Sequence, residues 1–433
     1  MAEDSSRRSF LKSVAALALA SATGAATGAE AQSSSGNRSE VRFGANFVYI
    51  GSYTLPSPAP LPPGSVPYRN GEGIYRFVQD PDSGELRDRT LVARTPSPSW
   101  LVMHPARHTL YAVNEWFGYG REHHGSVSAF AVDPESGSLT LRNMVDSGGA
   151  APVYLSLDAR GDFAFVANYA SGTLAVLPIH VDGSLGEAVA VHRDTGSVGA
   201  RRATSGPPGS FAISGHDAPH AHMILPDPAH RFVFSTDLGQ DRIYSHCFDA
   251  RTGQLTPNPA QAFVSLPTGD GPRHFTFHPN QRWFYSIEEE ASTVTFFDYD
   301  RERGTLHEQQ RISSLPRGFI GTSFASEIAI APHGRALYAL NRLHNAISIF
   351  AIEDSGRLAF SAEVPTRGDY PRSFAVDPNG RFLYICNKLS DNITHFRIDR
   401  ESAMLEFTGH YTAAPTPACL LFAQGVPTGT PSL

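Results

Sequence analysis

The chain has 433 residues and a formal net charge of −7, with 10% aromatic residues, 38 glycines and 32 prolines. The acidic balance argues against nucleic acid as a partner, because phosphate binding is driven by Lys and Arg. The abundance of aromatic residues, glycine and proline favours many short strands joined by turns over helices.

The N-terminal segment, residues 1–31, has the pattern of an export signal. Arg7 and Arg8 precede Phe-Leu-Lys, an alanine-rich apolar stretch follows, and Ala-Glu-Ala at 29–31 has the form of a cleavage site. Paired arginines in this context are typical of a twin-arginine signal, an ordinary secretory signal being the alternative. The apolar stretch is too short to span a bilayer. We therefore expect transient contact with the twin-arginine translocation machinery, then a linker at 32–45, and a periplasmic or secreted mature chain with no membrane partner.

One pattern then recurs along the chain. It consists of a proline, an apolar strand, a turn, a second strand ending in a polar pair, and a third strand before Gly-x-Leu; PSWLVMHPARHTLYAVNE (98–115) begins the first complete copy. Six copies are complete, and their pairs follow one another at intervals of 46 to 69 residues. The pairs are Asn114-Glu115, Asn168-Tyr169, Asp237-Leu238, Glu288-Glu289, Asn341-Arg342 and Asn387-Lys388. Three or four strands per repeat of this length predict a β-propeller.

A seventh copy is split between the two ends of the repeat region. Residues 46–54 form a second strand without a first, and residues 416–423 form a first strand without a second. Joining them leaves no exposed edge, which favours a closed ring over an open solenoid. The prediction is an all-β, seven-bladed β-propeller over 46–423, with one blade shared by the N- and C-terminal strands and a tail at 424–433. The insertion at 199–217 is read as a surface loop, and whether it closes over a site is left open.

Equivalent positions in the repeats predict which side chains come together in a functional site. Fifteen residues before the first member of each pair stand Ser99, Val153, His222, Arg273, Ser326 and Arg372. The charged second members are Glu115, Glu289, Arg342 and Lys388. The start of one strand lies beside the end of its antiparallel neighbour, so both sets converge on one channel mouth if the first strand is innermost. Arginines there suit a small anion, and a carboxylate or histidine suits proton transfer. The alternative is a polar, water-filled channel without activity.

Histidines and cysteines give weaker signals. His220 and His222 share one face of a strand, and two such histidines could bind zinc. However, no carboxylate or cysteine stands at ligand spacing beside them, and the nearby arginines would repel a cation. We therefore predict no metal and no cofactor. His274 is expected to point away from Arg273 and to pack. All three cysteines lie in apolar segments and are expected to be buried thiols, a Cys386–Cys419 bridge being the alternative. Neither a nucleophile elbow nor a Walker motif occurs.

The motifs GSYT (51–54), PHAH (219–222), DLGQDRI (237–243), GPRH (271–274) and ALNR (339–342) resemble the lactonase family of seven-bladed propellers. That family includes propeller-type 6-phosphogluconolactonases and carboxymuconate lactonising enzymes. The resemblance implies a metal-independent site formed by His222, Arg273, Glu289 and Arg342, with His220 as a neighbour. Glu288 departs from the family's usual asparagine, and Glu290 follows. We expect like-charge repulsion among these three acids to raise the pKa of one of them.

The resulting expectation is a lactonase that hydrolyses a sugar lactone, either 6-phosphogluconolactone or a related aldonolactone. Catalysis is assigned to His222, Arg273, Glu289 and Arg342. Substrate binding is assigned to His220, Arg372, Glu115 and Lys388. Three alternatives remain: a periplasmic propeller that binds a small anion without turnover, a muconate-type lactonising cyclase and an interaction scaffold.

Overall fold

A computed structural model describes residues 43–54, 70–120, 123–207, 212 and 215–423. Within these ranges the chain forms 29 strands, all of them in the compact unit of residues 40–433. No helix in the described ranges is long and apolar enough to cross a membrane. The predicted export signal and C-terminal tail lie outside the described residues.

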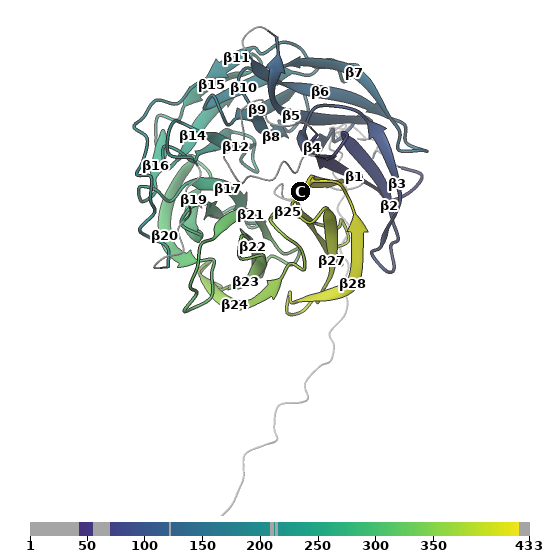
Figure 1. Cartoon of the computed structure of the whole chain (residues 1–433). Helices are drawn as coiled ribbons and strands as arrows, with labels where there is room; N and C mark the ends of the chain where they lie inside the picture. The colour runs from purple at the N-terminus through teal and green to yellow at the C-terminus, as the bar shows by residue number, and fades with distance from the viewer. Residues whose placement is uncertain (1–42, 55–69, 121–122, 208–211, 213–214, 424–433) are drawn as a thin grey trace, which may run out of the picture. The chain divides into compact units, whose positions relative to one another are not determined.

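The strands of the described residues form seven antiparallel sheets around a common centre, which confirms the predicted seven-bladed propeller (Figure 1). Six sheets follow one another along the chain. The first is β4 (Pro98–Met103), β5 (Thr109–Tyr119), β6 (His124–Val132) and β7 (Leu139–Asp146). The second is β8 (Pro152–Leu157), β9 (Phe163–Asn168), β10 (Thr173–Pro178) and β11 (Ala190–His192). The third is β12 (Ala221–Pro226), β13 (Phe232–Asp237), β14 (Arg242–Asp249) and β15 (Gln254–Pro257), with β16 (Phe263–Ser265) also paired to β14.

The next three sheets repeat this order. The fourth is β17 (Pro272–Phe277), β18 (Trp283–Glu288), β19 (Thr293–Asp300) and β20 (Thr305–Ser313). The fifth is β21 (Phe324–Ile330), β22 (Ala336–Arg342), β23 (Ala346–Ile352) and β24 (Leu358–Pro365). The sixth is β25 (Pro371–Val376), β26 (Phe382–Asn387), β27 (Asn392–Ile398) and β28 (Leu405–Ala413).

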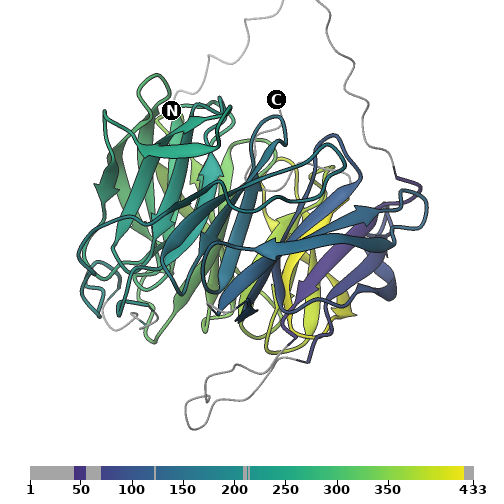
Figure 2. The same cartoon turned by 90° about the horizontal axis from the view of Figure 1, so that it is seen from above.

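The seventh sheet joins the two ends of the described chain. Its order is β29-β1-β2-β3, with β29 (Pro417–Phe422), β1 (Phe47–Ser52), β2 (Ile74–Gln79) and β3 (Leu86–Ala93). Val48 of β1 pairs with Phe422 of β29 in antiparallel register. The C-terminal strand therefore supplies the inner strand that the N-terminal segment lacks, as the split repeat predicted, and the ring closes. In the edge-on view the yellow C-terminal strands lie beside the purple N-terminal ones (Figure 2).

Tyrosines in the second strands lock neighbouring blades together. In five sheets a buried tyrosine donates its hydroxyl proton to a hairpin carbonyl of the next blade, at 2.7–3.0 Å. The pairs are Tyr49–Gly137, Tyr111–Gly183, Tyr285–Gly356, Tyr338–Ala403 and Tyr384–Gly84. The apolar body of each ring fills the space between sheets, and its polar tip satisfies a backbone acceptor.

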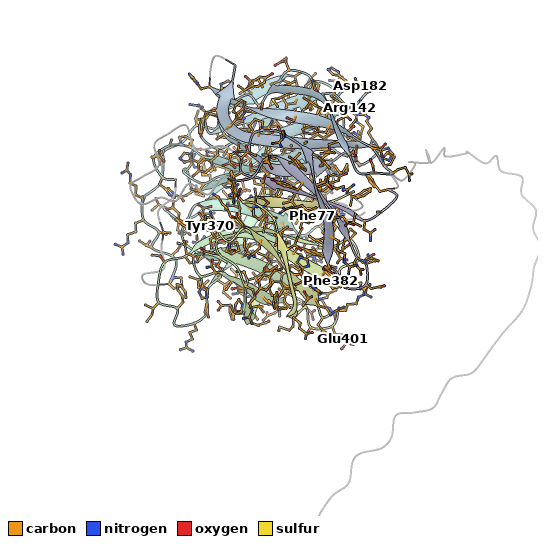
Figure 3. All side chains as sticks on the ribbon, turned by 45° about the vertical axis from the view of Figure 1, so that its right-hand side comes forward. Phe77, Arg142, Asp182, Tyr370, Phe382 and Glu401 are labelled. Atoms are coloured by element: carbon orange, nitrogen blue, oxygen red, sulfur yellow. The ribbon has the colours of Figure 1, made fainter. Side chains whose placement is uncertain are left out.

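The core lies between the sheets, whereas charged residues occupy the rim. Figure 3 shows Phe77 and Phe382 inside the molecule and Arg142, Asp182 and Glu401 at its outside. Phe77 and Phe382 are 1% and 0% exposed. Because sheet-to-sheet packing supplies the stability, the channel is left for polar side chains.

Candidate active site

A β-bulge recurs at the start of every inner strand. The register shifts past Ser99, Val153, His222, Arg273 and Arg372 in five sheets, past Ser326 and Glu327 in β21, and past Ala418 in β29. Such a bulge bends the strand and redirects the extra side chain. The positions identified by counting back along the repeat are therefore the bulge positions.

A second recurring contact places the ends of the second strands. In the fourth sheet the Glu289 amide donates to the Gly271 carbonyl at 2.7 Å, where Gly271 has a φ of +70° that suits glycine. The same amide-to-carbonyl bond joins Glu115 to Ser97 and Lys388 to Tyr370. Backbone geometry thus brings Glu115, Glu289 and Lys388 beside the bulges of their own sheets.

Glu289 lies between two arginines. Its Oε2 atom is 2.9 Å from Arg273 Nε and 2.6 Å from Arg342 Nη2. All three side chains are almost fully buried, with exposed fractions of 7%, 2% and 6%. Arg273 also donates to the Ser326 carbonyl, and Arg342 donates to the Ala325 carbonyl at 2.9 Å. The two guanidinium groups are therefore fixed in place before any ligand binds.

A second charged group lies where the first and sixth sheets meet the seventh. Glu115 Oε2 accepts from the Tyr53 hydroxyl at 2.8 Å and lies 3.3 Å from Arg372 Nη2. Over the Tyr53 ring lie Lys388 Nζ, 4.4 Å from the ring centroid, and the Arg372 guanidinium at 5.2 Å. Tyr370 links this group to the first, because its hydroxyl accepts from Arg342 at 3.3 Å. Sequence reasoning missed both tyrosines, although GSYT contains Tyr53.

His222 lies in the same positive environment. Burial, followed by the charges of Arg273 and other nearby groups, holds its pKa well below the usual range, so the imidazole is neutral at pH 7. Its Nδ1 atom is buried and has no hydrogen-bond partner among the described residues. Burial also lowers the pKa of Arg273 to about 10, with Arg342 and Arg372 as further causes, which leaves Arg273 charged.

The prediction that His274 points away from this region was wrong. The bulge at Arg273 shifts the strand, and His274 Nε2 lies 3.3 Å from Arg273 Nη1. Its ring contacts that of His222 at a centroid distance of 5.1 Å, while Nδ1 is 2.8 Å from Glu327 Oε1. Burial is the largest cause that lowers the His274 pKa to about 4. The sequence signal for Glu327 is a lone acid in an apolar strand, and it was missed.

His220 lies next to His222 with both ring nitrogens occupied. Nδ1 is 2.9 Å from the Tyr169 carbonyl oxygen, and Nε2 is 2.9 Å from Asp217 Oδ1. Its ring stacks on that of Tyr169 at 4.3 Å, and the same tyrosine meets His222 edge-on at 5.6 Å. The geometry thus offers His222, rather than His220, as the histidine with an available nitrogen.

The three consecutive acids have three different environments. Glu288 occupies the position of the buried asparagines in other blades and accepts hydrogen bonds from Ser286 and, at 2.9 Å, from Thr293. Its pKa is raised to about 8, as expected for one of the three, but the first cause is burial and the nearby acid is Asp270. The expected repulsion between neighbouring acids in the sequence is therefore not the reason.

The insertion read as a surface loop has buried residues near its end, at Ala212, Gly215 and His216. Arg201 and Arg202 are exposed, but the His216 side chain is 0% exposed. His216 Nδ1 is 3.0 Å from Glu290 Oε2 and Nε2 is 2.9 Å from Asp241 Oδ1. Burial alone would lower the His216 pKa, but hydrogen bonds to the two carboxylates outweigh it and raise the pKa to about 9. The end of the insertion is thus fixed to the residue that follows Glu289.

The cysteines are free thiols, so no Cys386–Cys419 bridge forms. Cys386 and Cys419 are buried as expected, whereas Cys247 is only half-buried. Burial raises the pKa of the Cys386 thiol to about 12. Burial also raises the pKa of the Cys419 thiol, so neither of these two buried cysteines has the low pKa that a nucleophilic thiol requires.

The charged residues of the site are closely packed. Arg273, Arg372, His274 and Trp100 are among the residues that line a space too small for a water molecule.

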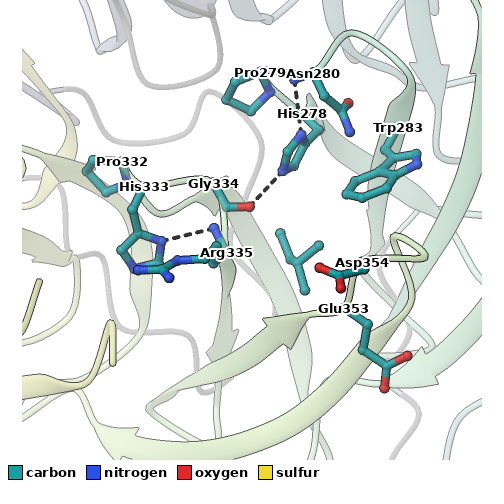
Figure 4. Close-up of a pocket in the computed structure, with 11 residues that line it drawn as sticks. His278, Pro279, Asn280, Trp283, Pro332, His333, Gly334, Arg335, Glu353 and Asp354 are labelled. Carbon is teal, nitrogen blue, oxygen red and sulfur yellow. Dashed lines mark hydrogen bonds between the residues drawn. The ribbon is translucent and has the colours of Figure 1, made fainter. Parts of the chain in front are cut away.

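A separate pocket lies at the opposite ends of the strands. It has a volume of about 350 Å³ and lies between the turns of the fourth and fifth sheets, where His278 meets the Gly334 carbonyl at 2.7 Å (Figure 4). None of the eight predicted site residues lines it. Its residues belong to turns that tie adjacent blades together.

Comparison with known proteins agrees with this geometry. The model of the seven-bladed β-propeller lactonases matches residues 47–422. A 6-phosphogluconolactonase of Bacillus subtilis is 31% identical over 379 residues, covering 87% of this chain and 98% of that protein. The structure of a periplasmic gluconolactonase from Pseudomonas aeruginosa has a TM-score of 0.74 at 29% identity, covering 87% of this chain and 98% of the other. A putative 6-phosphogluconolactonase from Bacteroides fragilis has a TM-score of 0.73 at 28% identity, covering 88% and 98%.

Proposed function

Because the chain belongs to the lactonase family of seven-bladed β-propellers, we propose that it hydrolyses a sugar lactone at the channel mouth. The observation that carries this proposal is the Glu289 carboxylate held between Arg273 and Arg342, with the neutral imidazole of His222 close to Arg273. The site combines fixed positive charge with two groups that accept protons, which is what hydrolysis of an ester without a metal requires.

In the proposed mechanism, water attacks the ring carbonyl carbon while a basic side chain takes one of its protons. The carbonyl oxygen becomes negatively charged, and the guanidinium groups of Arg273 and Arg342 stabilise it without having to reorganise. The ring C–O bond then breaks, and the departing ring oxygen receives the proton. The product is the open-chain hydroxy acid, and no metal or redox step is needed.

Two side chains compete for the role of base. Glu289 is at the centre of the site, but both arginines already engage its Oε2 atom. His222 is neutral and has a buried nitrogen without a partner among the described residues. Activity assays of Glu289→Gln and His222→Asn as a function of pH distinguish them. Protonation of the base makes kcat/KM fall at low pH, so the variant that lacks the base should no longer show this fall.

The second charged group is proposed to orient the sugar. Arg372 and Lys388 lie over Tyr53, and Glu115 accepts from its hydroxyl. This arrangement combines hydrogen-bond donors with an aromatic surface, which suits a polyhydroxylated ring carrying either a hydroxyl or a phosphate at its far end.

Export bears on the choice between these substrates. We infer that the paired arginines at 7 and 8 direct the chain to the periplasm or medium, where an unphosphorylated aldonolactone is the accessible substrate. Replacing both arginines by lysine is expected to leave the chain in the cytoplasmic fraction. An unchanged distribution between fractions would contradict export by this route.

The central experiment is a substrate panel on the purified mature chain. Glucono-δ-lactone, its 6-phosphate and a carboxymuconate are assayed side by side, with chelator present throughout. We expect lactone hydrolysis, with the larger kcat/KM for the unphosphorylated lactone. Turnover of the muconate alone would instead identify a lactonising cyclase. Absence of turnover together with thermal stabilisation by an aldonate would identify a binding protein.

A further inference from the structure

A second polar cluster lies away from the channel, between the second and third sheets. His192 ends β11, Asp194 follows two residues later, and His246 lies on β14 of the next sheet. The exposed fractions of their side chains are 26%, 11% and 1%. The lactonase mechanism uses none of these residues, and nothing in the β-propeller frame requires two histidines and an acid at one point.

The three side chains converge closely. The Nε2 atoms of His192 and His246 lie 2.9 and 3.3 Å from the same Asp194 oxygen, Oδ1. The two rings are 5.0 Å apart at an interplanar angle of 78°, so their edges rather than their faces point to the carboxylate. Within the described part of the chain, this trio is the group of His, Cys, Asp or Glu residues whose ligand atoms all lie within 4.8 Å of one another.

These separations are close to those of a metal site. Zinc bonds to imidazole nitrogen and carboxylate oxygen are about 2.0–2.2 Å long, which places two ligands of a tetrahedral ion roughly 3.3–3.5 Å apart. The observed 2.9 and 3.3 Å therefore need to lengthen by only a few tenths of an ångström to admit an ion. Two imidazoles and one carboxylate suit zinc and similar transition metals, whereas Mg²⁺ and Ca²⁺ prefer oxygen ligands alone.

We propose that His192, Asp194 and His246 bind one Zn²⁺-type ion that joins the second and third blades of the propeller. The ligation is incomplete in one respect, because His246 Nδ1 is buried with no partner among the described residues, and a carbonyl or carboxylate usually holds that atom in ligating histidines. The expected affinity is consequently modest, with a Kd on the order of 1–10 μM.

The ion has a structural role, because Asp194 lies five residues before the start of the insertion at 199–217. The carbonyl oxygens of Thr195 and Gly196, directly after Asp194, accept hydrogen bonds from Arg242 (3.3 Å) and Gln240 (3.0 Å). Both donors belong to the third sheet or the turn before β14. The far end of the same insertion is fixed by His216. A metal at Asp194 therefore fixes the start of a segment that ends beside the proposed catalytic residues.

The test uses the mature chain, stripped of metal by chelation and dialysis. Calorimetric titration with ZnCl₂ is expected to give one ion per chain, and a hundredfold excess over Kd is expected to raise Tm by roughly 3–5 °C. MgCl₂ is expected to do neither. His192→Gln and Asp194→Asn are each expected to weaken zinc binding at least tenfold. His344→Gln is the matched control, because His344 pairs with Glu363 at 2.7 Å without a third ligand, and its zinc binding should equal that of the wild type.

Three results would overturn the proposal. One is the absence of zinc binding by the wild-type chain. Another is unchanged affinity and stoichiometry in His192→Gln and Asp194→Asn, which would place the ion elsewhere, for example at His220 and His222. X-ray absorption on the wild-type zinc complex does not depend on the variants folding; it is expected to show two imidazoles and no sulfur, and a sulfur shell would exclude the site. Lactonase activity is read separately, so failure of either proposal leaves the other intact.

Discussion

The first and fourth sheets have the same strand order and the same bulge, yet they present different side chains to the channel. At the bulge the first has Ser99 and the fourth has Arg273. Both place a glutamate at the end of the second strand, but Glu115 meets Tyr53 and Arg372 from other sheets, whereas Glu289 is held by Arg273 of its own sheet and Arg342 of the next.

The difference between the two sheets shows that the repeat determines where a side chain lies but not its role in the site. The first member of each polar pair is buried, and Asn114 donates to Ser126 and Ser128 of its own sheet, whereas the second members Glu115 and Glu289 contact charged side chains of neighbouring sheets. A candidate catalytic site forms where neighbouring blades both have charged side chains at the bulge or at the second member of the polar pair.

The largest effect is expected at Glu289. Glu289→Gln keeps the shape of the side chain but removes the charge between the two arginines, and kcat should fall roughly 10²–10⁴-fold. The equivalent Glu115→Gln in the first sheet should lower kcat less than tenfold, because that carboxylate is assigned to orientation. Steady-state kinetics on the preferred lactone measure both, and equal losses in the two variants would contradict the distinction.

Glu288→Gln tests the buried member of the same pair. With a pKa of about 8 in the folded chain and 4.5 in the unfolded chain, Glu288 keeps its proton on folding, so its contribution to stability falls as pH rises from 4.5 to 8. Glutamine does not titrate. The variant should therefore become more stable than the wild type across this range, by on the order of 4 kcal/mol at pH 8. Urea unfolding at pH 5 and pH 8 measures the difference; a pH-independent difference would mean that Glu288 is already ionised.

His216→Gln tests the attachment of the insertion. Removing a buried imidazolium leaves Asp241 and Glu290 facing each other, which should lower the free energy of unfolding by roughly 3 kcal/mol at pH 6. His216 titrates at about 9 instead of 6.5, so its stabilisation is present below pH 6.5 and is lost as pH rises through 9. The gap between variant and wild type should accordingly narrow with rising pH. The surface pair of His344 and Glu363 provides the control, where His344→Gln should cost less than about 1 kcal/mol.

The smallest effect is expected for Lys388→Met. Its ammonium lies over Tyr53 at the mouth, away from the Glu289 carboxylate, and should contribute about 0.5–1 kcal/mol to binding. We expect KM to rise a few-fold with kcat unchanged. A loss of kcat comparable to that of Glu289→Gln would move Lys388 into the reacting part of the site.

Most of the fold was predictable because the strand and turn pattern of one blade recurs seven times in the sequence. The count of fifteen residues that aligns His222, Arg273 and Arg372 succeeds because each blade carries the same bulge at the same place. The direction of His274 was not predictable, since alternation along a strand fails at a bulge that sequence alone does not reveal. The contacts of His216 were equally hidden, because the insertion has no counterpart in other blades to compare with.

The strand Pro417–Phe422 is the last described element to leave the ribosome, and it forms the inner edge of the seventh sheet, beside β1. Until it is synthesised, β1 and the inner strands β4 and β25 lack a neighbour. A chain interrupted before residue 417 therefore leaves the backbone edge of β1 unpaired and prone to aggregation, whereas a chain that contains β29 closes the ring. Closure of the ring thus requires β29, and changes to this strand should impair folding more than equal changes in a hairpin at the rim.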